Sequence, residues 1–412
     1  MSERIQAPRG TQDVLGEQAV ARAELEHRAH AVLDAAGYAR IETPAFEATE
    51  LFARGVGEST DVVQKQMYTF SDAGGRSLTL RPEGTAPVCR AYLQHGMARL
   101  PQPVKLWYLS SFFRYERAQA GRYRQFWQVG AEAIGSDDPA VDAETILLLA
   151  ELLEELGVRA RLRLGSLGTL DARNRYRERL ASHLHAHAAE LSAEVRERID
   201  ANPLRAFDSD HAGTRAVTAR APKLLDALDP DDVEHFAAVR ALLDDAGLPY
   251  DVDATLVRGL DYYTRTVFEF DSPQLGAQSG VGGGGRYDGL IEALGGLPTP
   301  GCGFAAGAER ILLAGENVPL PTATVDIYVG YTNPDRRRTA FALALAARRA
   351  GLNAQVELAG RSLKGQLKHA DRIGARLLAL VEAEATALKE METGEQVTLG
   401  DDAVVAEALR RR

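Results

Sequence analysis

Hydrophobic and polar residues follow helical spacing in some parts of the chain and strand-like alternation in others. From Glu17 to Ala36 the apolar residues recur at the spacing of one helix face, which groups Leu25, Ala29 and Leu33. Gly37 is predicted to end this helix, because glycine readily adopts the left-handed conformation found at helix C-termini. The chain is therefore expected to begin with an amphipathic helix.

Short strand-like runs follow this first helix. They are GYARIETPAFE, interrupted by Pro44, then Met67–Phe70, Ser77–Leu80 and Val104–Leu109. The segment RPEGTAPVCRAYLQHG, from residue 81 to 96, places Glu83 and Thr85 at a strand-to-helix junction, with Thr85 the expected N-cap. Asp138-Pro139 is expected to begin a capped helix that ends near Gly157.

The stretch FRYERAQAGRYRQFWQVGAE, from Phe113 to Glu132, carries the densest chemistry. It holds four arginines, and it has two aromatic-rich arms around the turn Ala-Gln-Ala-Gly, which predicts a β-hairpin. Arginine binds phosphate or carboxylate through a planar fork, so the hairpin is expected to bind an anion. A solvated basic hairpin is the alternative that composition alone leaves open.

From Thr169 to Gly247 the sequence is charged, alanine-rich and almost entirely helix-forming, which indicates a helical insertion. His183 and His187 have the spacing of a possible metal-binding pair, but His185 points elsewhere and no carboxylate completes a site. We therefore interpret these histidines as a solvated helix surface.

Strand character is expected again at Thr255–Val257 and through RGLDYYTRTVFEFD. In SGVGGGGRYDGL, the glycines Gly282–Gly285 would allow the backbone to approach a ligand closely, and a flexible hairpin loop is the alternative. GCGFAAGAERILL predicts a strand packed against a helix that begins near Ala306, with Arg310 in its first turn. No glycine run here matches a P-loop or a dinucleotide fingerprint.

A linker around GENVPLPTAT precedes a third region of alternating strands and helices, which indicates a small α/β domain with a mixed sheet. This region contains a set of basic residues that could face RNA or simply keep a surface soluble. The set comprises Arg336–Arg338, Arg361, Lys364, Lys368 and Arg372.

Bulk properties narrow the class of protein. With 412 residues the chain is too long for one compact core. No apolar run is long enough to cross a bilayer, and two cysteines cannot form a disulfide framework, so we expect a cytoplasmic protein without membrane contact. A net charge of −10 argues against general coating of nucleic acid but permits a local RNA-binding face.

Together these stretches resemble the class II aminoacyl-tRNA synthetases, and specifically the histidyl-tRNA synthetase family, over nearly the whole chain. GYARIETPAF is similar to motif 1, the Phe113–Glu132 stretch to motif 2 and GCGFAAGAERILL to motif 3. RGLDYYTRTVFEF and SGVGGGGRYDGL look like the two stretches that distinguish the histidine enzymes. The resemblance implies an α+β catalytic domain with a six-stranded antiparallel sheet, at 1–168 and 248–318. It also implies a helical insertion at 169–247 and an anticodon-binding domain at 324–412.

The resemblance implies a two-step reaction in which histidine and ATP form histidyl-adenylate, and tRNA(His) then accepts the histidyl group. Arg114 and Arg258 would hold the α-phosphate of ATP, where a fixed positive charge stabilises the transition state. Arg258 would supply a charge that many class II enzymes take from a metal. Arg122 and Arg310 would bind the γ-phosphate and the adenine end, beside Glu116 at the ATP site. Mg²⁺ would accompany ATP, with no metal ligands assigned in the protein.

Histidine offers donors or positive charge on its ring and its ammonium group, and therefore needs a polar, acidic pocket. Matching positions imply an ammonium site and an imidazole site, with tyrosine walls, for which a helix-start acid and core aromatics are the alternatives. The expected residues are Glu83, Gly84, Thr85 and Gln128 around the ammonium group, Glu132 and Tyr263 toward the ring, Tyr262 and Tyr287 as walls, and Arg114 and Arg258 beside the carboxylate.

Arg117 and Gln119, in the turn of the motif 2 hairpin, would meet the acceptor end of tRNA. Ala118 stands where the family commonly has proline, which puts the rigidity of that turn in question. Motif 1 implies a homodimer. Two alternatives remain: a non-catalytic regulatory subunit of ATP phosphoribosyltransferase, and an RNA-binding or sensing protein that uses an inactive synthetase fold. Retention of Arg258, Arg310, Glu83 and Glu132 favours an enzyme.

Overall fold

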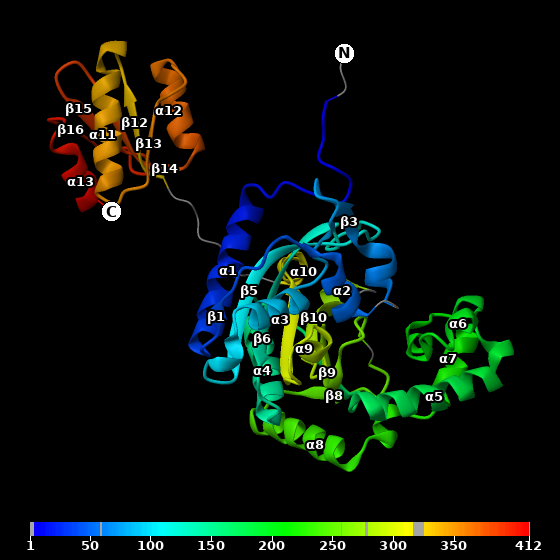
Figure 1. Ribbon diagram of the computed structural model, residues 1–412. Coiled ribbons are helices and arrows are strands. Elements are labelled where there is room, and N and C mark those ends of the chain that lie inside the picture. The colour runs from blue at the N-terminus through cyan, green and yellow to red at the C-terminus, as the bar shows by residue number, and fades with distance from the viewer. Residues whose placement is uncertain (1–3, 58–59, 257, 277–278, 316–324, 412) are drawn as a thin grey trace. The chain divides into compact units, whose positions relative to one another are not determined.

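A computed structural model of the protein describes residues 4–57, 60–256, 258–276, 279–315 and 325–411. The chain forms two compact units, Met1–Leu320 and Pro321–Arg412. The predicted linker lies almost wholly at 316–324, outside the described residues. The expected end of the catalytic domain at 318 and the expected start of the anticodon-binding domain at 324 fall in the same segment. Each unit is therefore described by itself (Figure 1).

The first unit is built on an eight-stranded sheet with the order β1-β5-β6-β11-β10-β9-β7-β8. Its central six strands pair antiparallel, which confirms the expected catalytic sheet, and β1 and β8 add parallel edges. The strands are β1 Ala39–Arg40, β5 Val104–Phe113, β6 Gln125–Ile134, β7 Arg161–Ser166, β8 Tyr250–Val252, β9 Thr264–Asp271, β10 Gly280–Arg286 and β11 Gly301–Gly307.

Three helices cover one face of this sheet: α1 (Glu17–Ala35), α4 (Pro139–Glu155) and α10 (Ala308–Ala314). Leu33 and Leu149 pack there against Trp107 and Phe304 in one buried cluster. The left-handed Gly37 (φ 80°) follows the C-cap of α1 and stops the helix as predicted. Backbone amides of 37 and 38 donate there to the carbonyls of 34 and 33. The Asp138 carboxylate accepts a bond from the Ala140 amide, 2.8 Å, and caps α4 as expected.

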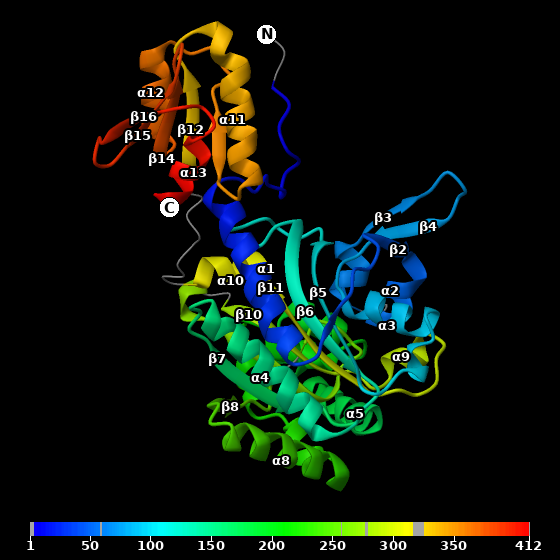
Figure 2. The same cartoon turned by 90° about the vertical axis from the view of Figure 1, so that its left-hand side faces the viewer.

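The opposite face carries α3 (Thr85–Gln94), whose Val88 and Tyr92 pack against Leu106 and Tyr108 of β5. A small sheet of order β2-β4-β3 stands beside it, with β2 at Phe46–Ala48, β3 at Tyr68–Ser71 and β4 at Ser77–Leu80. Figure 2 shows the β3–β4 hairpin reaching out from α2 (Thr49–Val56) and α3. The helix α9 (Leu290–Ala293) contacts both helices.

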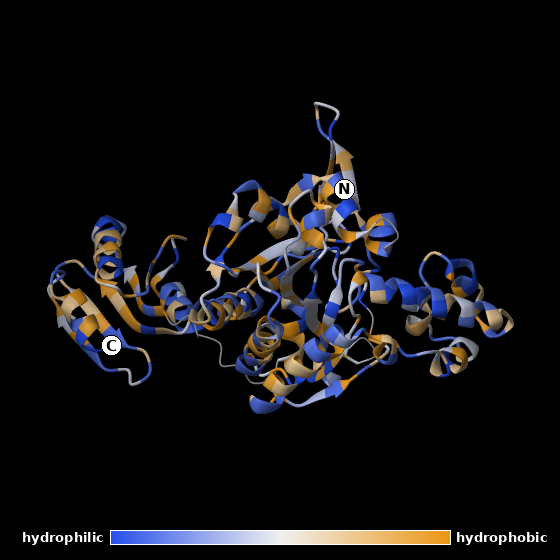
Figure 3. Cartoon of the chain, turned by 60° about the horizontal axis from the view of Figure 1, so that its bottom comes forward, coloured by the Kyte–Doolittle hydropathy of each residue, from blue (hydrophilic) through white to orange (hydrophobic). Residues whose placement is uncertain are grey.

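Four helices lie between β7 and β8, at the place of the predicted insertion: α5 Leu170–Ala186, α6 Ala193–Arg198, α7 Ala212–Ala219 and α8 Pro230–Asp245. Figure 3 shows hydrophilic residues along much of α5. Its buried face carries Tyr176, Leu180 and Leu184, which share a cluster with Val217 of α7. The His183 and His187 rings stack at 4.6 Å, and each forms a hydrogen bond with a backbone carbonyl.

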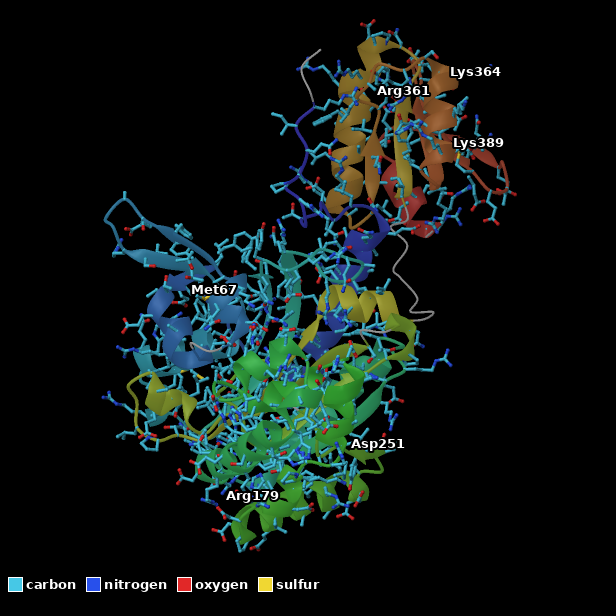
Figure 4. The ribbon with its side chains drawn as sticks, turned by 90° about the vertical axis from the view of Figure 1, so that its right-hand side faces the viewer. Met67, Arg179, Asp251, Arg361, Lys364 and Lys389 are labelled. Atoms are coloured by element: carbon cyan, nitrogen blue, oxygen red, sulfur yellow. The ribbon has the colours of Figure 1, made fainter. Side chains whose placement is uncertain are left out.

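The second unit has a mixed sheet of order β13-β12-β14-β15-β16, which confirms the predicted α/β architecture. Its strands are β12 Val325–Tyr331, β13 Ala354–Val356, β14 Ala375–Val381, β15 Thr386–Glu390 and β16 Gln396–Leu399, and its helices are α11 Arg337–Arg349, α12 Leu363–Arg372 and α13 Val404–Arg410. Figure 4 labels Arg361 and Lys364 at the start of α12. Arg361 pairs with the buried Glu357 carboxylate at 3.1 Å, so part of the basic set has a structural role.

Three predictions of local structure were wrong. Thr85 is the first residue of α3 rather than its N-cap, because the Glu83 carboxylate accepts the amide bonds of Thr85 and Ala86 instead. Thr255 lies in a turn closed by the Asp253 carboxylate, and Val257 lies outside the described residues. The strand expected from Arg258 begins only at Thr264, because Arg258–Tyr263 forms a loop.

The glycine run also has a different role from the loop considered as an alternative. Gly282–Gly285 lies in β10, at the centre of the sheet, paired with β9 and β11. A Cβ on Gly284 would lie 1.9 Å from the carbonyl oxygen of Gly303, so a side chain there would separate the strands. In the described part of the chain, no helix is both long and apolar enough to span a membrane.

Candidate active site

Two pockets adjoin over the centre of the large sheet. We call the first the tyrosine pocket. It is lined by Val62, Glu83, Gly84, Thr85, Arg114, Gln128, Arg258, Gly259, Leu260, Tyr262, Tyr263, Gly283, Tyr287, Gly303, Phe304 and Ala305. Every residue that the resemblance assigns to histidine binding lines this pocket except Glu132. Residues from four separate stretches of sequence therefore come together in one place.

Glu132 lies directly behind the pocket wall and is fully buried. The Thr85 hydroxyl donates to its Oε1 and the Tyr287 hydroxyl to its Oε2, each at 2.8 Å, and the Tyr108 hydroxyl lies 3.4 Å from Oε1. Gly303 faces it on β11, where a Cβ would lie only 1.9 Å from Oε2. Burial raises the pKa of Glu132 to about 8, even though the three hydroxyl donors favour the charged form.

Glu83 combines two roles that the sequence left as alternatives. Its carboxylate accepts amide bonds from Thr85 (2.8 Å) and Ala86 (3.0 Å), so it is a helix-start acid. It also lines the pocket, where the Tyr262 hydroxyl lies 3.4 Å from Oε2. Burial raises the pKa of Glu83, and the two amide bonds oppose that shift. Two buried carboxyl groups of fixed orientation therefore lie at the pocket, Glu83 in its lining and Glu132 behind it.

Arg258 lies in the loop that precedes β9, and its guanidinium lies over the glycine strand. Its Nη1 is 3.1 Å from the Glu269 carboxylate, and a Cβ on Gly283 would lie 3.1 Å from the same nitrogen. Burial disfavours the charge of Arg258, but Glu269 and Tyr263 outweigh that effect and raise its pKa. The glycine at 283 thus provides the space for a cation at the sheet surface.

We call the second pocket the arginine pocket. It is lined by Arg114, Glu116, Gly121, Arg122, Tyr123, Phe126, Gln128, Arg258, Glu269, Gly280, Val281, Gly282, Ala305, Gly307, Glu309 and Arg310. Arg114, Gln128, Arg258 and Ala305 line both pockets. Two cationic groups therefore stand at the junction between the pockets.

The cations of the arginine pocket are held in place by neutral and acidic neighbours. The Arg114 Nε donates to the Pro82 carbonyl at 2.8 Å, and the guanidinium lies over the Phe126 ring. Glu116 lies 3.8 Å from both Arg114 and Arg122. Burial and the nearby charge of Arg122 lower the pKa of Arg310. Cations that repel one another in this way favour a ligand with several negative charges.

The hairpin turn has the predicted form. The backbone groups of Gln119 and Arg122 pair at 2.9–3.0 Å, and Gly121 has φ 71°. Arg117 and Gln119 are exposed and line neither pocket. The hairpin therefore presents Arg114 and Arg122 to the pockets, and Arg117 and Gln119 to solvent.

Arg286 directly follows the glycine run, and its partner lies far away in the sequence. Arg286 is fully buried beside Tyr287, and its guanidinium pairs with the buried Asp142 of α4 and donates to the Ser136 carbonyl at 3.0 Å. His235 of α8 lies 3.3 Å from the same carboxylate. A charged arginine directly after a glycine strand could have suggested a buried ion pair, but no local pattern points to Asp142 as its partner.

Among the described residues, no three His, Cys, Asp or Glu side chains form a metal-binding cluster. The arginine pocket contains Glu116 and Glu269, both already close to arginines. Mg²⁺ in phosphate-binding sites commonly uses one or two carboxylates and otherwise phosphate oxygens and water. These side chains fit an ion that arrives with a phosphate ligand, and Glu116 and Glu269 would be the carboxylates that hold it.

Comparisons with known proteins agree over nearly the whole chain. The model of the family described as "Histidyl-tRNA synthetase" matches residues 10–311. A histidine–tRNA ligase of Mycolicibacterium vanbaalenii is 48% identical over 99% of this chain and 98% of its own length. One from Acetivibrio thermocellus is 44% identical over 97% and 98% of the two chains. The crystal structure of apo histidyl-tRNA synthetase from S. aureus is similar with a TM-score of 0.82 and 37% identity, covering 98% of this chain and 99% of that one.

Proposed function

The chain belongs to the histidyl-tRNA synthetase family and is a ligase of the aminoacyl-tRNA synthetase type; from that premise we propose that it charges tRNA(His) with L-histidine by way of histidyl-adenylate. ATP is the energy source, and AMP and pyrophosphate are the other products. The observation that carries this proposal is the junction of the two pockets, where Arg114 and Arg258 stand between an acidic pocket and a cationic one.

In the first step, the histidine carboxylate attacks the α-phosphorus of ATP and pyrophosphate leaves. The tyrosine pocket holds the amino acid and the arginine pocket holds the triphosphate, so the reacting groups meet at the shared wall. Arg114 and Arg258 stabilise the negative charge that develops on the α-phosphate oxygens. Arg122 and Arg310 bind the distal phosphate and the adenine end. Mg²⁺, when bound with ATP, neutralises charge on the pyrophosphate side.

Recognition of histidine rests on groups with unused hydrogen-bonding capacity in the tyrosine pocket. The Oε1 atom of Gln128 is buried and has no hydrogen-bond partner among the described residues, and an ammonium group would satisfy it. Glu83 and Thr85 complete the ammonium site. Glu132 and Tyr263 face the imidazole, while Tyr262 and Tyr287 form the walls. A ligand without an ammonium group would leave the buried Oε1 atom of Gln128 without a donor, which is a physical basis for requiring an amino acid in this pocket.

In the second step, the terminal ribose hydroxyl of tRNA(His) attacks the acyl carbon of the adenylate, and AMP leaves. We propose that Arg117 and Gln119 contact the acceptor end, because their turn is exposed beside the pockets. The C-terminal unit would bind the anticodon. A homodimer formed through motif 1 and a cytoplasmic location also belong to this proposal; the two cysteines are free thiols, as expected in a reducing compartment.

The principal alternative is a non-catalytic regulatory subunit of ATP phosphoribosyltransferase. Such a subunit has no need for a cationic wall between two pockets. The positions of Arg114, Arg258 and Arg310 around one continuous site favour catalysis instead.

Pyrophosphate exchange tests the proposal directly. Purified, folded protein with Mg²⁺ should incorporate labelled pyrophosphate into ATP only when L-histidine is present. The control is the same assay with each of the other amino acids at equal concentration. Absence of exchange from folded protein would exclude the enzyme and favour the regulatory or RNA-sensing alternatives.

A further inference from the structure

The helical insertion forms hydrogen bonds with the loop that precedes β9 and carries Arg258. Arg173, in the first turn of α5, is almost fully buried. Its Nη1 donates to the carbonyl oxygens of Asp261 and Tyr263, each at 2.8 Å, and its Nη2 lies 3.7 Å from the Asp261 carboxylate. We propose that Arg173 is a positioning residue for histidine activation and that the insertion is thereby part of the scaffold of the amino-acid site. This inference rests on the proposed function.

The loop that precedes β9 separates two cavities. Arg258, Gly259 and Leu260 line the tyrosine pocket on one side. The same three residues line a second cavity on the other side, where Arg173, Leu204 and Arg205 of the insertion are among the facing residues. Leu260, Tyr262 and Tyr263 pack into the neighbouring hydrophobic clusters. The loop backbone between the two cavities is held by directional hydrogen bonds, one of them from the Asp261 amide to the Val56 carbonyl. Arg173 supplies two of these bonds to the backbone on either side of Tyr262.

A second attachment fixes the point where the loop enters β9. Arg265 is the one non-glycine residue with a left-handed backbone among the described residues, with φ 47°. Its amide donates to the Gly168 carbonyl and its carbonyl accepts from Leu167, both at 2.7 Å. Its side chain pairs with Asp232 at 3.0 Å. Such a backbone conformation persists only when neighbouring groups enforce it.

Asp232 joins the two ends of the insertion at this point. One carboxylate oxygen accepts from the Thr169 amide at 2.8 Å, at the start of α5, and the other accepts from Arg265. Asp232 itself is buried in the first turn of α8. The two helices at the base of the insertion therefore share one attachment to the loop, and a displacement of α5 would move both Arg173 and this attachment.

The geometry specifies which kinetic constants should change. The two carbonyl groups that accept from Arg173 flank Tyr262, a proposed wall of the histidine site. Loss of these hydrogen bonds should therefore weaken histidine binding most. Arg258 lies in the same loop, so the rate of adenylate formation should also fall. The remaining ATP contacts, from Arg122 and Arg310, come from the hairpin and α10 and should keep the KM for ATP near its normal value.

The test is pyrophosphate exchange with Arg173→Met, which keeps an unbranched apolar side chain but removes the donors, and with Arg173→Lys, which keeps the charge without the fork. The matched control is Arg179→Met, an exposed arginine on the same helix (Figure 4). We expect the KM for histidine to rise about tenfold in Arg173→Met and less in Arg173→Lys. The KM for ATP should stay within about twofold, kcat should fall, and the control should match the wild type.

Several results would overturn the inference. A folded Arg173→Met with a wild-type KM for histidine would do so, as would equal increases in the KM for histidine and for ATP, since those indicate general disorder. If Arg173→Met does not fold, Arg173→Lys and Asp232→Asn decide the matter by the same two constants. Wild-type protein without exchange would instead refute the proposed function, and so the two failures are distinguishable.

Discussion

The two adjoining pockets hold their charged groups in opposite ways. In the tyrosine pocket, the acidic groups are buried and already hydrogen-bonded within the protein; Glu132 is fully buried and Glu83 is 3% exposed. In the arginine pocket, the charged groups are partly open, with side-chain exposures of 40% for Arg122 and 22% for Glu116. The first arrangement is preorganised for one shape and one pattern of donors. The second supplies positive charge that a flexible polyanion can meet.

This difference predicts how each pocket responds to mutation. A substitution in a closed hydrogen-bond network leaves buried partners without a bond, which costs more than the lost contact itself. Removal of an exposed cation mainly removes attraction, part of which water already screens. The largest effect is expected at the junction, where a charge acts on the transition state in a site shielded from water.

Arg258→Ala should have the largest effect. It should slow histidyl-adenylate formation by about 10²–10³-fold, the range for loss of one preorganised donor to a developing charge. Histidine affinity should change much less, because the ammonium and imidazole contacts remain. Single-turnover adenylate formation and calorimetric titration with histidine measure the two quantities. The control is Arg161→Ala, an exposed arginine on β7 that pairs with Asp251. Equal losses of affinity and rate would show that Arg258 acts in binding rather than in the transition state.

At about pH 9, where Glu132 is ionised, Glu132→Gln should disrupt the tyrosine pocket and raise the KM for histidine by about 10²-fold. The reason is that Thr85 and Tyr287 both donate to the carboxylate and an amide cannot accept on both sides. The KM for ATP should stay within about twofold of the wild type. A parallel rise in both KM values, measured by pyrophosphate exchange, would contradict the separation of the pockets.

The same variant has a pH signature. Burial raises the pKa of Glu132 from 4.5 to about 8, so the folded protein retains a proton there that the unfolded chain loses above about pH 4.5. This group therefore lowers wild-type stability progressively as pH rises from about 4.5 to 8. Relative to the wild type, Glu132→Gln should gain a few degrees in Tm over that interval. A Tm difference that does not change between pH 5 and 8 would show that Glu132 is ionised throughout.

Arg310→Ala should have the smallest effect of the three. The KM for ATP should rise about tenfold, the scale of one charge-assisted hydrogen bond, while the KM for histidine stays unchanged. The rise should be smaller in high salt, because the arginine pocket is partly open and its charges are screened. Initial-rate exchange at two ionic strengths measures this, again against Arg161→Ala. A larger rise in the KM for histidine than in the KM for ATP would contradict the assignment of the arginine pocket to ATP.

The sequence predicted most of the architecture because its signals are local. The alternating arms around the Ala-Gln-Ala-Gly turn specified the β5–β6 hairpin, and the helix from Asp138-Pro139 is capped as expected. The predicted residues of the tyrosine pocket were gathered by resemblance rather than by pattern, since they come from four distant stretches. Nothing in their spacing alone shows that they meet.

What the sequence missed depends on distant partners. Glu83 takes the amide groups that Thr85 was expected to cap, because a carboxylate is the stronger acceptor and lies at the right distance. Arg173 lies in a charged helix that reads as a solvated surface, yet its guanidinium is buried against a loop about 90 residues later in the chain. The glycine run was expected to approach a ligand closely, with a flexible loop as the alternative; its place in a central strand was not predicted, because strands rarely lack side chains.

The bare strand at the centre of the sheet has a consequence for folding. A strand of glycines has almost no side-chain pattern to fix its register. Arg286, the first charged residue after the glycines, is paired in the interior with Asp142 and can occupy that position in one register only. The ion pair between Arg286 and Asp142 therefore fixes the register of β10. Chains that lack it should populate misaligned, slowly refolding sheets even where every residue that touches a substrate is intact.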